Sequence, residues 1–115
     1  MNVSPRKMAA AYELLRNLQP FSRWKLPPAS EVRFGITRAK DTYGICQRVN
    51  GRHCLWAKRR MSMMTFPETM AHEMCHMRED AIAPQYSGRP YRHGDDFKKL
   101  AEQVCKSLGF NPSTF

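Results

Sequence analysis

Residues 65–80 have the sequence TFPETMAHEMCHMRED, and the interpretation of the whole chain starts from them. Thr65 and Glu68 have the spacing of a capping box, so the stretch predicts a helix that continues to its end. Inside it, His72 and His76 are four residues apart, which is about one helical turn. Both imidazoles should therefore leave the helix on one face, where they can bind the same cation.

The five residues that end at His76 form the pattern H-E-x-x-H, with Glu73 as its second member. Glu73 is one step round the helix from His72, so its carboxylate can reach a water molecule on a metal without binding the ion itself. Two surface histidines on a solvated helix are the alternative interpretation. The glutamate at this position favours metal-assisted hydrolysis, with Glu73 as the base.

A catalytic zinc ion needs a third protein ligand and an open fourth position. His93 is the favoured third ligand, because the turn-rich segment 81–92 can reverse the chain and bring it back. His53 falls in a predicted hairpin, where a structural role is the simpler expectation. Glu79 and Asp80 are carboxylate alternatives that follow the motif closely in the same helix.

The remaining pattern predicts a single α+β domain over residues 1–115. Ser4 and Pro5 begin an N-terminal amphipathic helix as its cap and first residue. Alternating or apolar runs predict three strands, and Asn50-Gly51 predicts a tight hairpin between the second and third. We therefore expect a three-stranded antiparallel meander, followed by the H-E-x-x-H helix and a C-terminal helix that begins near Gly94. The predicted strands lie at 32–37, 43–49 and 53–61.

The charge is unevenly distributed along the chain. The net charge is +9, and residues 1–66 contain 13 Lys and Arg against three Asp and Glu. Such asymmetry favours a polyanionic partner, most simply nucleic acid, although charged edge strands also serve only to prevent aggregation. The candidate nucleic-acid contacts sit around the hairpin and at the end of the third strand: Arg48, Arg52, Lys58, Arg59 and Arg60.

The compartment is expected to be cytoplasmic. No apolar run is long enough to span a bilayer, and the N-terminal stretch lacks the apolar core of a secretory signal. The four cysteines have no metal-knuckle spacing, so we expect reduced thiols in or near the core.

Two short motifs together resemble a known family. HEMCH at 72–76 and HGDDF at 93–97 are similar to the H-E-x-C-H and H-G-x-x-F motifs of the SprT-like zinc metalloprotease domain. The resemblance implies a minimal zincin-like metalloprotease core without the C-terminal zinc ribbon, and one catalytic Zn²⁺. It implies that zinc is bound by His72, His76 and His93, with Glu73 as the catalytic base.

The resemblance also implies a substrate class. Relatives include proteases that act on proteins crosslinked to DNA, so we expect a peptide hydrolase acting on proteins at or near DNA. Minimal versions occur in phages and mobile elements, for which the compartment would be the host cytoplasm. The alternative is a non-proteolytic module that binds nucleic acid or a partner on a zincin scaffold, such as a mobile-element counter-defence protein. Candidates for a second oxyanion donor are Tyr86, Tyr91 and Arg92.

Overall fold

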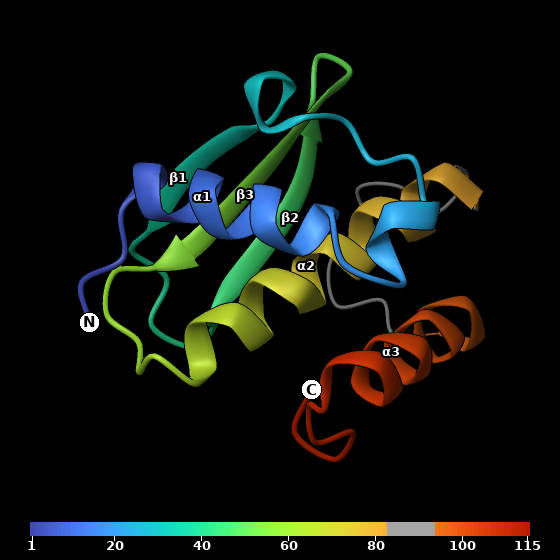
Figure 1. The fold of residues 1–115 in the computed structure, drawn as a ribbon. Helices are drawn as coiled ribbons and strands as arrows, with labels where there is room; N and C mark the ends of the chain where they lie inside the picture. The colour runs from blue at the N-terminus through green and yellow to red at the C-terminus, as the bar shows by residue number, and fades with distance from the viewer. Residues whose placement is uncertain (83–93) are drawn as a thin grey trace.

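The structure is a computed structural model that describes residues 1–82 and 94–115. These residues form a compact α+β fold with three α-helices, two short 3-10 helices and a three-stranded mixed sheet (Figure 1). The elements are α1 (Pro5–Arg16), η1 (Phe21–Arg23), η2 (Ala29–Glu31), β1 (Arg33–Thr37), β2 (Gly44–Val49), β3 (Arg52–Lys58), α2 (Thr65–Ile82) and α3 (Asp95–Leu108).

The sheet has the order β1-β3-β2, so the antiparallel meander predicted from the sequence is wrong. The β2–β3 hairpin is antiparallel as expected, and Asn50 and Gly51 both have positive φ in its turn. β1, however, pairs with β3 in parallel. The physical reason lies in β3, whose residues Cys54, Leu55 and Ala57 are buried. The most buried strand takes the centre, where both of its backbone edges are hydrogen-bonded.

One face of the sheet carries the core. The strand registers place Phe34, Leu55 and Cys46 side by side on this face. The ring of Tyr12 from α1 meets Phe34 edge-on, with ring centroids 5.5 Å apart. α2 packs on the same face, and Figure 1 shows both helices crossing it. α3 lies against α2, so α2 is packed between the sheet and α3.

The apolar face of α2 is built largely from methionine. Met70, Met74 and Met77 recur at helical spacing, and each is at most 1% exposed, so they form part of the core. Cys75 is also fully buried, and all four cysteines are free thiols. Unbranched methionine side chains adapt to irregular gaps, and here they fill the space between two helices and a sheet.

Three helix ends show how the sequence sets the boundaries. The Ser4 hydroxyl accepts a hydrogen bond from the backbone N–H of Lys7, so the predicted cap of α1 is confirmed. At α2 the cap lies earlier than predicted, because the hydroxyl of Ser62 accepts from the N–H of Thr65. Gly109 ends α3 at a left-handed φ of 79°.

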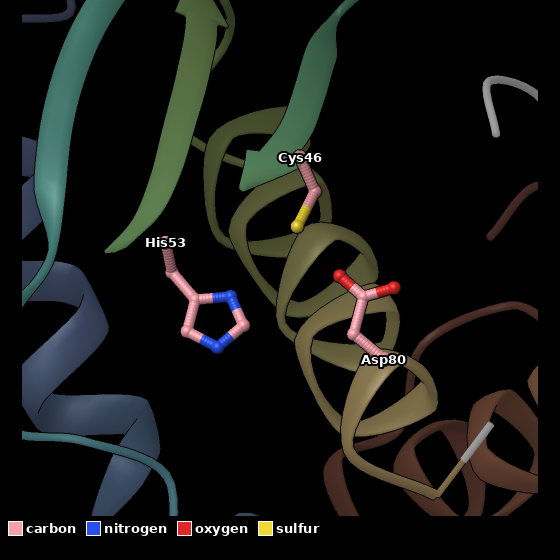
Figure 2. Close-up of side chains that lie close together, drawn as sticks. All are labelled: Cys46, His53 and Asp80. Atoms are coloured by element: carbon pink, nitrogen blue, oxygen red, sulfur yellow. The ribbon is translucent and has the colours of Figure 1, made fainter. Parts of the chain in front are cut away.

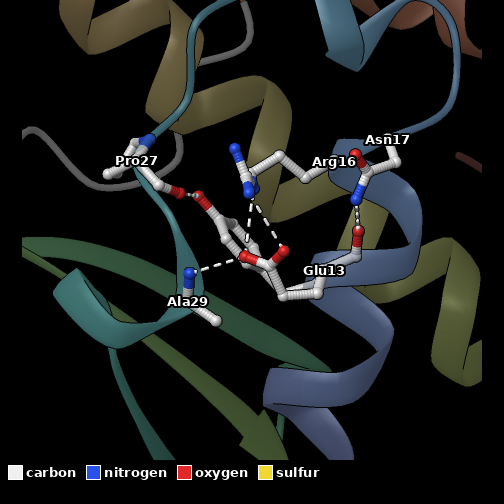
Figure 3. Close-up of polar contacts among 6 residues, drawn as sticks. Glu13, Arg16, Asn17, Pro27 and Ala29 are labelled. Carbon is white, nitrogen blue, oxygen red and sulfur yellow. Dashed lines mark hydrogen bonds and ion pairs between the residues drawn. The ribbon is translucent and has the colours of Figure 1, made fainter.

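An irregular segment connects the first helix to the sheet and is fastened to α1 by polar contacts (Figure 3). The hydroxyl of Tyr12 donates to the carbonyl oxygen of Pro27. The carboxylate of Glu13 accepts from the backbone N–H of Ala29 at 2.7 Å and from the guanidinium of Arg16 at 3.0 Å. These bonds fix where β1 begins, because β1 follows this segment within a few residues.

No described helix is long and apolar enough to cross a membrane.

On the face of the sheet opposite the helices, Gly35 is a position where a larger side chain should destabilise the fold. A Cβ atom added at Gly35 would collide with the ring of its cross-strand neighbour Trp56. We expect Gly35→Ala to lower the free energy of unfolding by about 1–3 kcal/mol, because the ring must shift. Urea unfolding measures this cost. In a Trp56→Val background the same change should cost much less, and an equal cost in both backgrounds would contradict the explanation.

Candidate functional site

The two motif histidines lie on one face of α2, as their spacing predicts. Their ring centroids are 5.1 Å apart, and both side chains are half-buried. The third predicted ligand, His93, lies outside the described residues. The same holds for the three candidate oxyanion donors, Tyr86, Tyr91 and Arg92.

Aromatic side chains from the C-terminal part of the chain surround this histidine pair. The Phe97 ring, in the first turn of α3, stacks on His76 with centroids 4.5 Å apart and contacts His72 at 4.9 Å. Phe115 also contacts the His72 ring, at 5.3 Å. Phe97 is the last residue of the HGDDF motif, so the C-terminal end of that motif lies against the HEMCH motif of α2.

A carboxylate orients one of the imidazoles. The Nδ1 atom of His76 lies 3.1 Å from Oε1 of Glu79, which is 4% exposed. A carboxylate at this nitrogen favours the tautomer that carries its proton on Nδ1. The lone pair of Nε2 is then available to a metal ion. Sequence reasoning considered Glu79 as a ligand, whereas the structure places it beside a ligand candidate.

Glu73 points to a different neighbour, the edge strand β2. A Cβ atom added at Gly44 would lie 2.9 Å from Cγ2 of Thr69 and 3.0 Å from Oε2 of Glu73, so a larger residue would crowd the contact between the strand and the helix. Glu73 is 6% exposed, and burial raises its pKa to about 8. The carboxyl group is therefore shielded beside the backbone of β2, next to the histidine pair along the helix.

A second group of chemically active side chains was not predicted. Cys46 of β2, His53 of β3 and Asp80 of α2 point toward one another (Figure 2), with ligand atoms within 4.8 Å. The sequence does not directly indicate this group, because the spacing of the three residues matches no known metal-binding motif. The Asn50-Gly51 turn does fix the hairpin register, which by itself puts Cys46 and His53 on one face of the sheet.

The basic residues selected from the sequence do not form one patch. Arg48 and Arg52 lie at the turn of the hairpin, whereas Lys58 lies at the other end of β3. Arg52 and Lys58 are six steps apart along the strand, a distance of about 20 Å. The two groups of basic residues are therefore too far apart to form a single patch. Arg59 and Arg60 follow Lys58 beside the N-terminus, where the N–H of Val3 donates to the carbonyl of Arg59.

Comparison with protein-family models and with curated proteins found no match for this chain.

Because the carboxyl group of Glu73 is buried, we expect the stability of the metal-free protein to depend on pH. The folded-state pKa of Glu73 is about 8 against an ordinary value of 4.5, so between these values the folded state holds a proton that the unfolded state has lost. Stability should therefore fall as the pH rises through this window, by up to about 1.4 kcal/mol per pH unit.

Glu73→Gln removes this proton linkage, so the variant should gain stability relative to the wild type as the pH rises from 5 to 8 (about the window set by the shift). Urea unfolding of the metal-free proteins at a series of pH values measures the difference. Parallel stability curves for the two proteins would contradict the assignment.

Proposed function

We propose that this protein is a zinc-dependent peptide hydrolase of the SprT-like type, with zinc held by His72, His76 and His93. The observation that carries the proposal is the pair of imidazoles on one face of α2, with Glu79 bound to the outer nitrogen of His76. Metal-binding histidines characteristically donate this second N–H to a carboxylate or carbonyl group. This arrangement of two imidazoles and one carboxylate supports the proposal, and the third proposed ligand, His93, lies outside the described residues.

The chain's own residues have distinct roles in this proposal. Zinc supplies Lewis acidity, which polarises a peptide carbonyl and makes water a stronger acid. In its ionised form, which the positive charge of a bound zinc ion would favour, Glu73 would accept the proton of the attacking water and pass it to the leaving amine. Glu79 fixes the tautomer and direction of the His76 ring. Burial beside Gly44 keeps bulk water away from the Glu73 carboxyl group.

The edge strand β2 is the proposed place for the substrate. It is an outer strand of the sheet, and its Gly44 backbone lies against Glu73. An extended peptide that adds to this edge would pass the catalytic carboxyl group with its main chain hydrogen-bonded to the strand. Recognition through the main chain suits an enzyme that accepts many unfolded sequences.

Replacement of Glu73 tests the catalytic part of the proposal. Glu73→Gln should still bind about one zinc ion at the histidine site, because the histidines remain, but cleavage of a disordered protein such as casein should fall by about 10²- to 10⁴-fold. His72→Ala and His76→Ala should lose this zinc and the activity together. Glu102→Gln, an exposed change on α3, is the matched control and should retain both.

The same variant separates the enzyme from the alternative function, a binding module on a zincin scaffold. A scaffold needs the histidines for folding but has no use for the Glu73 carboxylate. If Glu73→Gln cleaves casein as fast as the wild type, the hydrolase proposal is wrong.

The basic first half of the chain supports DNA as the place where the enzyme acts. Arg59 and Arg60 are exposed beyond β3 and are the side chains we choose to test. The double change Arg59→Glu and Arg60→Glu should weaken DNA binding and reduce its salt dependence, by a slope of about 0.9 for each phosphate that the variant no longer neutralises. Fluorescence anisotropy across a salt series measures both.

The matched control is Lys98→Glu with Lys99→Glu, which changes the charge equally on the exposed side of α3. It should affect DNA binding much less. Equal effects of the two double variants would mean that net charge alone, and not the end of β3, governs binding.

A further inference from the structure

Three side chains that could bind a metal ion come from three different elements and lie close together between the sheet and α2. Cys46 comes from β2, His53 from β3 and Asp80 from α2. One ligand atom of each lies within 4.8 Å of the other two. Figure 2 shows the thiol and the carboxylate directed toward the gap between them, with one nitrogen of the imidazole facing the same gap.

The fold explains why these residues meet. Cys46 pairs with Leu55, and His53 lies two residues before Leu55, so both side chains project from the face of the sheet that α2 covers. Asp80 follows Glu73 by seven residues, about two helical turns, and thus lies on the same side of α2. That side runs along β2, since Glu73 lies against Gly44.

One nitrogen of the His53 imidazole, Nδ1, is buried without a hydrogen bond from the described residues. A buried polar atom without a partner costs about 1–3 kcal/mol, so such an atom calls for an explanation. Burial also lowers the pKa of His53, which favours the neutral ring that metal ions bind.

We propose that Cys46, His53 and Asp80 form a second metal site, separate from the H-E-x-x-H motif, for a divalent transition ion such as Zn²⁺ or Co²⁺. One thiolate, one imidazole and one carboxylate suit ions of borderline softness, whereas Mg²⁺ and Ca²⁺ prefer oxygen ligands alone. In a tetrahedral zinc site, ligand atoms are about 3.5 Å apart. The observed 4.8 Å limit requires the three side chains to close by about 1 Å, which small side-chain rotations provide.

The place of the site in the fold gives it a role. An ion there would join both strands of the hairpin to α2, on the side of the helix that carries Glu73. It would fix the edge strand β2 relative to the candidate catalytic helix. This role does not depend on the proposed hydrolase activity, because the ligands are different residues.

The test uses Co²⁺, whose bond to a thiolate gives a near-ultraviolet charge-transfer band. The variant His72→Ala/His76→Ala removes the motif pair, so any remaining ion must sit elsewhere. We expect this variant to bind about one Co²⁺ per chain and to show the band. Adding Cys46→Ser should abolish it, whereas adding Cys105→Ser, a free cysteine outside the group, should leave it unchanged. Absence of the band, or its persistence without Cys46, would overturn the proposal.

A second measurement uses the wild-type chain, in case the double variant does not fold. Zn²⁺ at ten times its dissociation constant should slow alkylation of Cys46 by iodoacetamide about tenfold, as mapped by mass spectrometry. Asp80→Asn should weaken this protection. An alkylation rate that zinc does not change would refute the site. Neither measurement involves peptide cleavage, so failure here and failure of the hydrolase proposal are distinguishable.

Discussion

The close contact between the edge strand β2 and helix α2 is the constraint on which the rest of the structure depends. It exists because Gly44 has no side chain, so that the carboxyl group of Glu73 can lie against the backbone of the strand. This contact buries the motif glutamate and raises its pKa. It also brings α2 over the hairpin, where Asp80 meets Cys46 and His53. Both candidate sites therefore lie along the helix that makes this contact.

Local patterns in the sequence were sufficient for the helices and the hairpin. Ser4 caps α1 through its hydroxyl group, whereas Gly109 at the end of α3 and Asn50-Gly51 in the turn have the positive φ values that favour these residue types. The parallel pairing of β1 with β3 could not be predicted in this way. It depends on the packing that makes β3 the central strand, which no single segment specifies.

The candidate sites likewise differ in how far local sequence patterns predict them. His72, Glu73 and His76 belong to one helix, so their spacing alone predicts their common side and their neighbourhood. The roles of Glu79 at His76 and of Phe97 against both imidazoles appear only once packing is known. The group of Cys46, His53 and Asp80 joins three elements, and its members come together through strand register and helix placement.

The central position of β3 also bears on the order in which the strands are expected to pair during folding. β1 has no surface on which to add until β3 is in place, and β3 is joined to β2 by the shortest connection in the sheet. Short-range pairs close with less loss of chain entropy than distant ones. We therefore expect the β2–β3 hairpin to form early and β1 to add to it afterwards.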